Sequence, residues 1–336
     1  MLRNVLLSLI AFVFAASAAL AQSDLSPSFR MIQINGPDVN ESVSVHALSD
    51  YGHVLGRYGS WERRLFVIQP YEEMRFLDED LLYPADINNS GYAVGGSYPN
   101  WISINGTAYD LQTPGGSDDL FINDKGQIAG NYNGSRSKGY FMKSFKAEEW
   151  VELGDLGGNE TDVLGLNNNG QVVGSSKKSD GRFYAFVWNG TSGMTELNIS
   201  PGPWRRAEAY GINDRGDIVA GNQSVIYTIE AETGTQEFML VPAGGRPRAV
   251  AINNLRQVVG TVGQSGDTEP FFYQYGRGRG QYLADLVTNM PSDVTSFYVV
   301  DINNRGQILA VTYHANQGIL KSWILQPRRS VIAYEP

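Results

Sequence analysis

The sequence has no cysteine and only three histidines in 336 residues. The lack of cysteine excludes disulfide scaffolds, cysteine-ligated zinc, iron–sulfur clusters and cysteine nucleophiles. Three histidines are too few for a His-rich metal centre, so the sequence predicts no metal site and no cofactor. Phosphate-loop, dinucleotide-binding, Gly-x-Ser-x-Gly and His-Glu-x-x-His motifs are also absent.

Positive charge is scarce as well. The chain carries 26 Lys and Arg against 35 Asp and Glu, a net charge of −9, and no basic run is longer than two residues. Nucleic-acid binding normally needs a dominant positive face because phosphate contacts supply most of the affinity, so we expect no nucleic-acid partner. After the first 21 residues no stretch is apolar enough to cross a bilayer, which predicts no integral membrane segment.

The first 21 residues have the pattern of an export signal. Arg3 precedes an apolar run over residues 5–20, and Ala19 and Ala21 form a small-x-small site before Gln22. The sequence therefore predicts a cleaved secretory signal over 1–21 and a single domain over 22–336. The expected location is secreted or periplasmic.

Glycine is abundant, with 38 residues, and much of it belongs to a repeat. Seven copies follow one pattern: an aliphatic residue, then Asn, then Asn or Asp, then any residue, then Gly, then a polar residue and two or three aliphatic residues. The second position of the copies is Ser49, Asn88, Asn123, Asn167, Asn213, Asn253 and Asn303. The steps between them, 35 to 50 residues, are typical of propeller blades.

Each repeat predicts four short strands. In the fourth copy, residues 163–167 lead into an Asn-Asn-Gly turn and 171–175 return as a hairpin, because glycine supplies the left-handed backbone of a tight turn. Residues 183–188 and 194–198 follow as the third and fourth strands. The sequence thus predicts an all-β, seven-bladed β-propeller of four-stranded blades, with a solenoid of stacked units as the alternative.

The two ends of the chain bear on how the ring closes. Residues 29–34 precede the first copy and have the pattern of a fourth strand, whereas the seventh copy supplies only its first three strands. We expect the N-terminal strand to complete the last blade, which would protect the sheet edges. Residues 331–334 are the alternative closing strand.

The fourth copy resembles the extracellular HAF repeat. The segments that carry the resemblance are LGDLGG at 153–158, LNNNGQVVGS at 166–175 and YAFVW at 184–188, with Tyr184 where that family has the His of its His-Ala-Phe triplet. The other six copies share mainly the Ile-Asn-x-x-Gly hairpin, so the resemblance spans residues 40–325 unevenly. It implies export and a propeller-like array of repeats, and it brings no catalytic residue.

Asn and Gly of the repeat predict a structural role, because an Asn side chain can bond the backbone two residues on and Gly tolerates positive φ. Arg256 stands at the Gly position of the sixth copy, so a left-handed Arg256 would cost about 1 kcal/mol and Arg256→Gly should raise stability. His53 stands where other copies have Gln, and we expect it to be exposed.

Basic and aromatic residues gather in the loops that join the second strand to the third and one blade to the next. In a propeller these loops share one face, which predicts a binding surface for an anionic carbohydrate: guanidinium pairs with carboxylate or sulfate, and rings stack on sugars. Ordinary solvated loop charge is the alternative. The candidate ligand-binding residues are Arg57, Trp61, Arg64, Arg182, Trp204, Arg205, Arg206, Arg246 and Arg248.

Two histidines and a tyrosine are candidates for catalysis. His46 and Tyr210 are the polar members of an inner-strand column otherwise held by Ala85, Leu120, Leu164, Val250 and Val300. We expect His314 in the loop between the second and third strands of the last blade. With a nearby Arg, such a set could serve β-elimination on a uronate.

The sequence therefore favours a secreted, non-catalytic propeller that binds an extracellular polysaccharide or protein. A lyase acting on an acidic polysaccharide through His46, Tyr210 and His314 is the first alternative. A surface scaffold without a small ligand is the second.

Overall fold

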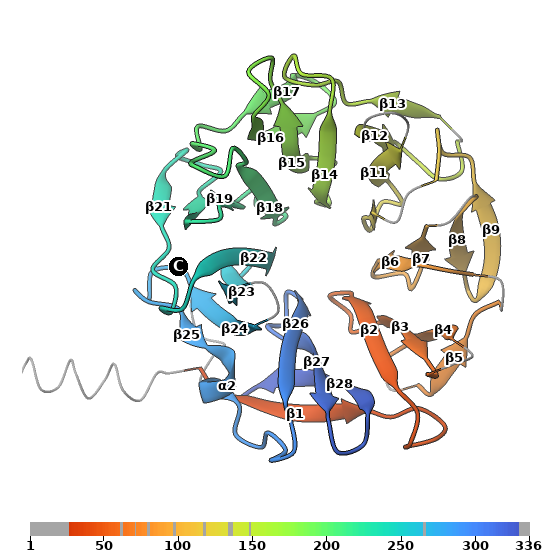
Figure 1. The fold of residues 1–336 in the computed structure, drawn as a ribbon. Helices are drawn as coiled ribbons and strands as arrows, with labels where there is room; N and C mark the ends of the chain where they lie inside the picture. The colour runs from red at the N-terminus through yellow and green to blue at the C-terminus, as the bar shows by residue number, and fades with distance from the viewer. Residues whose placement is uncertain are drawn as a thin grey trace, which may run out of the picture.

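The computed structural model describes residues 27–328, apart from 61–62, 71, 79–80, 97–98, 117–118, 134–136, 148 and 265–266. Seven four-stranded antiparallel sheets are arranged as a ring (Figure 1). Residues of all seven inner strands line cavities at its centre, which we call the channel. This confirms the predicted all-β, seven-bladed propeller. The predicted signal segment 1–21 and the alternative closing strand 331–334 lie outside the described residues. No helix in the described part of the chain has the length and apolar character needed to span a bilayer.

Each of the first three blades is a meander whose first strand lines the channel. Their strands are β2 (Val43–Leu48), β3 (Val54–Tyr58), β4 (Arg64–Ile68) and β5 (Met74–Phe76); β6 (Pro84–Ile87), β7 (Ala93–Gly95), β8 (Asn100–Ile104) and β9 (Thr107–Leu111); and β10 (Leu120–Ile122), β11 (Ile128–Asn133), β12 (Ser137–Met142) and β13 (Trp150–Glu152).

The later blades repeat this order, and the short helix α2 (Leu283–Leu286) follows the sixth blade. Their strands are β14 (Thr161–Leu166), β15 (Val172–Lys177), β16 (Phe183–Asn189) and β17 (Gly193–Glu196); β18 (Glu208–Ile212), β19 (Ile218–Asn222), β20 (Val225–Ile229) and β21 (Gln236–Phe238); β22 (Arg246–Ile252), β23 (Gln257–Gln264), β24 (Asp267–Gln274) and β25 (Gln281–Tyr282); and β26 (Ser296–Ile302), β27 (Ile308–His314) and β28 (Ile319–Pro327).

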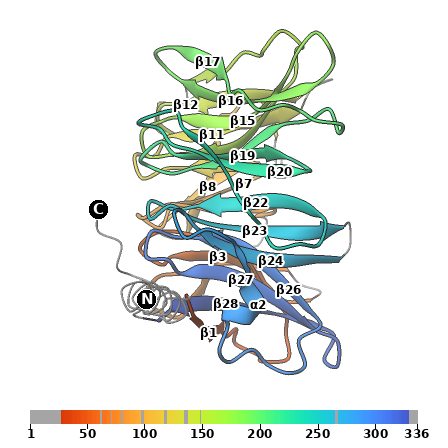
Figure 2. The same cartoon turned by 90° about the vertical axis from the view of Figure 1, so that its left-hand side faces the viewer.

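The last blade is completed by β1 (Phe29–Ile34), as the sequence predicted. β1 pairs antiparallel with β28 from Phe29 opposite Pro327 to Ile34 opposite Ser322, and the side view shows the two strands together at one end of the ring (Figure 2). Buried Phe29 packs with residues of the sixth and seventh blades, including Phe272 at a ring-centroid distance of 5.4 Å. The ring is thus locked by pairing the start of the described chain with its end.

Apolar side chains are buried mainly between neighbouring blades. Val173 and Ala185 of the fourth blade, for example, share a cluster with Ala209 and Ile218 of the fifth. The largest fully buried side chains include third-strand aromatics, namely Trp101, Tyr140, Phe186 and Phe271. A single blade could not bury both of its faces, so each depends on its neighbours.

The repeated Asn joins blades as well as shaping its own turn. In the fourth blade, Asn167 Oδ1 accepts the backbone N–H groups of Asn169 and Gln171 at 3.0 Å, which confirms the predicted turn role. Its Nδ2 donates to the carbonyl of Asn213 in the next blade at 2.9 Å. The same interblade bond recurs at 2.8 to 3.1 Å from Asn88, Asn123, Asn213, Asn253 and Asn303.

In the first blade the turn is held by a different pair of side chains. Ser49 Oγ accepts the N–H of His53 and lies 3.0 Å from His53 Nδ1. His53 is only 8% exposed, so the expectation of an exposed side chain was wrong. The imidazole fills the place that Gln takes elsewhere, against Gly91 of the second blade.

Candidate functional site

The inner strands carry a β-bulge at the same place in six of the seven blades. In the first blade the register shifts between Val45 and Ala47, so His46 is left unpaired. A bulge of this kind adds one residue to one strand and re-aims its side chain. The six bulged residues line a channel cavity of about 250 Å³, and they are His46, Ala85, Leu164, Tyr210, Val250 and Val300.

The third blade departs from this pattern. Leu120 pairs in register with Gly130 and is buried between blades, whereas Phe121 lines the cavity. Leu120 was predicted to hold the inner-strand position of His46 and Tyr210, but it does not face the cavity with them because β10 has no register shift at this position.

His46 and Tyr210 line the same cavity, so the structure brings together two of the three candidate catalytic residues. Burial, together with the charge of Arg57, lowers the pKa of His46 to about 4, which leaves the imidazole neutral at pH 7. In the described part of the chain His46 Nε2 has no hydrogen-bond partner. Burial raises the pKa of the Tyr210 hydroxyl above its ordinary value.

Two carboxyl groups that were not predicted from the sequence also line the cavity. Asp86 and Asp301 occupy the position after the bulged residue, and both line the cavity. Burial raises the pKa of Asp86 to about 6. Burial, and then the charge of Asp86, raise the pKa of Asp301 to about 7. The signal was in the sequence, because the same position elsewhere holds only Ala47, Phe121, Gly165, Gly211 and Ala251.

Each of these carboxyl groups accepts two backbone N–H bonds. Asp301 takes one from Ile302 and one from Leu48 of the first blade, at 2.7 and 3.1 Å. Asp86 takes one from Ile87 and one from Ile122 of the third blade, at 2.8 and 2.9 Å. Both side chains therefore bridge their own inner strand to that of the next blade.

His314 does not belong to this cavity. It is the last residue of β27 rather than a loop residue, is 1% exposed and pairs with Ile319 in the hairpin. Its Nδ1 lies 3.0 Å from Asp293 Oδ2, and its Nε2 lies 2.9 Å from Thr312 Oγ1. The expected loop position was wrong because β27 and β28 extend their pairing as far as His314.

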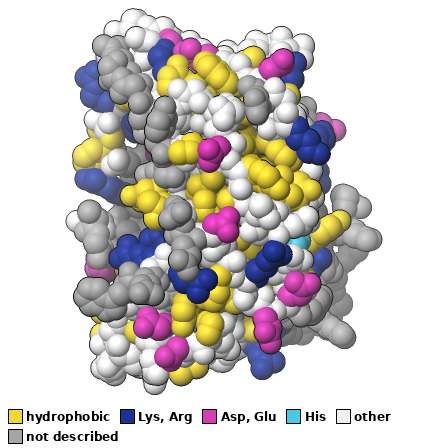
Figure 3. All heavy atoms as spheres, turned by 90° about the vertical axis from the view of Figure 1, so that its right-hand side faces the viewer, with side chains coloured by type: hydrophobic (Ala, Val, Ile, Leu, Met, Phe, Trp, Pro, Cys, Tyr) yellow, Lys and Arg dark blue, Asp and Glu magenta, His cyan; other side chains and the backbone are white. Residues whose placement is uncertain are grey.

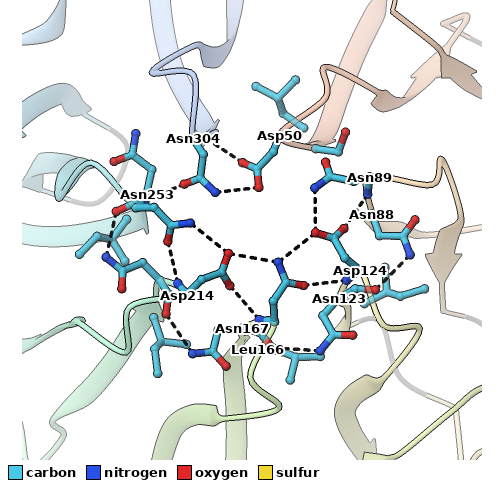
Figure 4. A pocket seen from close by; sticks show the side chains of 18 of the residues that line it. Asp50, Asn88, Asn89, Asn123, Asp124, Leu166, Asn167, Asp214, Asn253 and Asn304 are labelled. Carbon is cyan, nitrogen blue, oxygen red and sulfur yellow. Dashed lines mark hydrogen bonds between the residues drawn. The ribbon is translucent and has the colours of Figure 1, made fainter. Parts of the chain in front are cut away.

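A ring of amides and carboxylates surrounds the end of the channel away from the His46 cavity (Figure 4). Asp124 Oδ2 accepts from the side-chain amides of Asn89 and Asn168, at 2.8 and 2.9 Å, and Asp214 is bonded in the same way by Asn168 and Asn254. Asn304 bonds Asp50 through both its N–H and its amide. No group of three or more His, Asp or Glu in the described residues is placed to hold a metal ion.

A layer of aliphatic side chains lies under this ring. All seven residues before the repeated Asn or Ser line the cavity of about 150 Å³ at the mouth, and they are Leu48, Ile87, Ile122, Leu166, Ile212, Ile252 and Ile302. The carboxylates of the ring accept hydrogen bonds from neighbouring amides. These bonds account for the polar side chains of the ring, which therefore do not indicate a ligand.

On the loop face, four predicted residues of the fourth to sixth blades form what we call the Trp204 patch: Arg182, Trp204, Arg205 and Arg246. Trp204 is 46% exposed, and the Arg246 guanidinium lies 3.7 Å from its ring centroid. Arg205 has a left-handed backbone, φ 61°, and donates to the carbonyl of Asp180 at 3.0 Å. Arg182 lies 3.9 Å from Asp180 Oδ2.

The other predicted ligand-binding residues are dispersed. Arg206 is neutralised by Asp162 and Glu208 at 2.6 and 2.7 Å and stacks on Phe183. Arg64 stacks on Phe76 at 4.2 Å in the first blade. Arg57 lies near His46, Arg248 is exposed two residues before Val250, and Trp61 lies outside the described residues.

On the side of the ring that Figure 3 shows, the described side chains form no large patch of one charge. Figure 3 looks at the side that carries β5 and β9, and acidic and basic side chains alternate there with apolar ones. The outer strands expose single aromatics such as Tyr109 and Phe238, 54% and 47% exposed. The cavity and the Trp204 patch are therefore the more distinctive sites.

No family model and no curated protein matches the chain. Among solved structures, it is similar to the WD40 repeats of RRP9, with 12% identity and a TM-score of 0.56 over 90% of this chain and 98% of that one. It is also similar to a chain of the mitotic checkpoint complex, with 14% identity and a TM-score of 0.51 over 90% and 95%. An acylaminoacyl peptidase from Pyrococcus horikoshii matches at 10% identity and a TM-score of 0.52 over 86% of this chain, which spans about half, 52%, of that peptidase. Identities this low show the propeller fold alone.

Proposed function

We propose that this protein is an exported, non-catalytic binding module for an extracellular glycan or protein, and that the Trp204 patch is its recognition surface. The observation that carries the proposal is a half-exposed tryptophan ring stacked by one guanidinium and flanked by two more. A fixed aromatic face with neighbouring forked donors suits a sugar that bears a carboxylate or sulfate. An acidic glycan is therefore the ligand that the patch fits best.

The patch is also held in shape before any ligand arrives. Arg246 donates to Gln223 Oε1 at 3.3 Å while it stacks on Trp204, and the bend at Arg205 fixes the loop that carries the tryptophan. Less conformational entropy is lost on binding when the contacting side chains are already ordered.

The test is titration of the purified chain with polygalacturonate, alginate and neutral dextran, followed by calorimetry and tryptophan fluorescence. We expect binding of an acidic polysaccharide that falls at least about tenfold in Trp204→Ala and in Arg246→Gln, because each removes one central contact. Phe238→Ala is the matched control, since Phe238 is equally exposed but lies on the outer strand β21.

Equal losses in Trp204→Ala and Phe238→Ala would overturn the assignment of the patch. Binding to none of the polysaccharides would leave a protein ligand or a scaffold role. Ultraviolet absorbance of unsaturated ends, followed in the same mixtures, would detect the lyase alternative. That alternative keeps His46 and Tyr210 at the cavity but loses His314, and a signal that His46→Ala abolishes would replace the binding proposal.

A further inference from the structure

The two cavity carboxyl groups are not required by the propeller itself. Asp86 and Asp301 bridge the inner strands of the second and third blades and of the seventh and first. The other five blades make the same junction with Ala47, Phe121, Gly165, Gly211 and Ala251, none of which has a side-chain acceptor. Two half-buried acids that face one cavity, and that five blades do without, are therefore candidates for a role besides joining the strands.

These carboxyl groups lack a cationic partner. No Lys or Arg is among the described residues that line the cavity. Among described residues, the hydrogen bonds to Asp86 and Asp301 come from backbone N–H groups, one to each oxygen, so every oxygen keeps acceptor capacity. His46, with an unpartnered Nε2, and the Tyr210 hydroxyl complete the polar wall. When both carboxyl groups are ionised the cavity has more acceptors than donors, which is the complement of a ligand with several N–H bonds.

We propose that the channel cavity binds a small organic ligand through its primary ammonium group, held between Asp86 and Asp301. The site is distinct from the Trp204 patch and goes beyond the function proposed above. An ammonium supplies the positive charge that two neighbouring carboxylates need when both are ionised.

The remaining walls favour an organic cation over a metal ion. Phe121, Leu164, Val250 and Val300 give the cavity an apolar side that can pack on carbon. The described residues offer no group of three His, Asp or Glu close enough to ligate a metal. At about 250 Å³ the cavity has room for a ligand of several non-hydrogen atoms.

The charges around the site set the direction of its pH dependence. The carboxyl groups must lose their protons to pair with the ammonium, so binding should strengthen as pH rises through 6 to 7. His46 stays neutral over this range and Tyr210 stays protonated, while Arg57, near His46, keeps its charge throughout. The charge of Asp50 acts on Asp301 and that of Asp124 acts on Asp86, and burial raises the pKa of Asp50 as well. The expected pH dependence therefore belongs to Asp86 and Asp301 together with these nearby acids.

The probe is n-butylammonium chloride, added to the purified chain at constant ionic strength and followed by chemical-shift changes of cavity residues. n-Butanol is the uncharged control and calcium chloride the metal control. We expect saturable shifts with n-butylammonium alone, and a dissociation constant at least about tenfold weaker at pH 5 than at pH 7.5.

Variants locate the site. Leu164→Lys places an ammonium on the wall of the same cavity and should abolish n-butylammonium binding, whereas Leu164→Met, a neutral side chain of similar reach, should still give saturable binding, so that the loss can be assigned to charge rather than to size. Asp301→Asn should weaken binding at least about tenfold. If Asp301→Asn fails to fold, the Leu164 pair still tests the proposal.

Equal binding of n-butanol, preference for calcium, or undiminished n-butylammonium binding in Leu164→Lys would each overturn the proposal. Trp204→Ala should bind n-butylammonium as the unaltered chain does, because Trp204 is not part of the cavity wall. Failure of the glycan experiment and failure of the ammonium experiment can therefore be told apart.

Discussion

Arg256 shows how two local departures from a repeat compensate one another. Its φ of 57° confirms the left-handed position predicted from its place in the repeat. In the fourth, fifth and seventh blades this position is Gly and faces a Gln of the preceding blade: a Cβ on Gly170 would lie 3.1 Å from Gln127 Oε1. Facing Arg256, the preceding blade has Asp217 in place of Gln, and Arg256 Nε donates to Asp217 Oδ2 at 2.8 Å.

The ion pair changes the expected sign of the Arg256→Gly substitution. Arg256 also donates to Glu230 at 2.6 Å, and the Asp217 side chain is only 5% exposed. Burial acts to raise the pKa of Asp217, but the bonds from Arg256 hold it below the ordinary value. Relief of strain returns about 1 kcal/mol, whereas loss of a partner for a buried carboxylate costs about 3 kcal/mol or more.

We therefore predict that Arg256→Gly alone lowers the free energy of unfolding by about 1 to 3 kcal/mol. The double variant Asp217→Gln with Arg256→Gly rebuilds the pair found in other blades, so it should recover most of that loss. Urea unfolding of the two single variants, the double variant and the unaltered chain measures the coupling. An Arg256→Gly variant at least as stable as the unaltered chain would show that relief of backbone strain offsets or exceeds the loss of the ion pair.

At the scale of elements, the sequence predicted the hairpins but not how their inner strands meet the channel. Aliphatic-Asn-x-x-Gly fixes a turn by local chemistry, so seven blades could be counted from it. Strand alternation then assigns every second inner-strand residue to the interblade core. The bulge after Val45 and its counterparts break that alternation, and a bulge leaves no clear mark on a single repeat. The place of Asp86 and Asp301 in the cavity was missed for this reason. The pairing of Arg256 with Asp217 was missed because the two residues lie 39 positions apart, on different blades.

The inner strands also give the fold a pH dependence of known sign. The pKa values of Asp86 and Asp301, about 6 and about 7, lie above their ordinary value near 4, so the folded chain holds these protons more tightly. Their contribution to stability is therefore full at low pH and falls as pH rises from 4 to 7. His46, with its pKa lowered to about 4, contributes in the opposite sense between pH 4 and 6.5.

We predict that Asp301→Asn makes the stability curve less steep. Each excess proton held by the folded state corresponds to about 1.4 kcal/mol per pH unit. The free energy of unfolding of the variant, minus that of the unaltered chain, should rise steadily between pH 4.5 and 7 and level off above that. Urea titrations at four pH values give this difference, in which carboxyl groups that do not interact with Asp301 cancel, whereas Asp86 contributes because its charge acts on Asp301. A difference that does not change with pH would mean that Asp301 titrates normally.

At the scale of the whole molecule, closure depends on one strand pair formed by the two ends of the described chain. Neighbouring blades elsewhere are joined by short chain connections as well as by packing. β1, by contrast, is held to β28 by strand pairing. It is also held to the segment that follows the sixth blade, where the N–H of Thr288 donates to the carbonyl of Phe29. The amide ring continues across the seam, since Asn303 and Asn304 bond Ser49 and Asp50. The closing strand was predictable from the sequence because the last repeat lacked a fourth strand.

If this seam governs unfolding, a covalent link across it should stabilise the entire ring. Arg30 and Gln326 are directly opposed in the β1–β28 pair, and the chain has no other cysteine to mispair. Directly opposed residues of antiparallel strands have Cα atoms about 4.5 to 5.5 Å apart, within the span of a disulfide. The free energy of unfolding of the double variant Arg30→Cys with Gln326→Cys should be about 2 to 5 kcal/mol higher in its oxidised form than in its reduced form, because the link closes nearly the whole chain. The reduced form controls for the lost contacts of Gln326 with Gln307. Equal unfolding rates of the two forms in urea would place the first opening of the ring at another blade junction, since a link across a seam that stays closed adds nothing to the kinetic barrier.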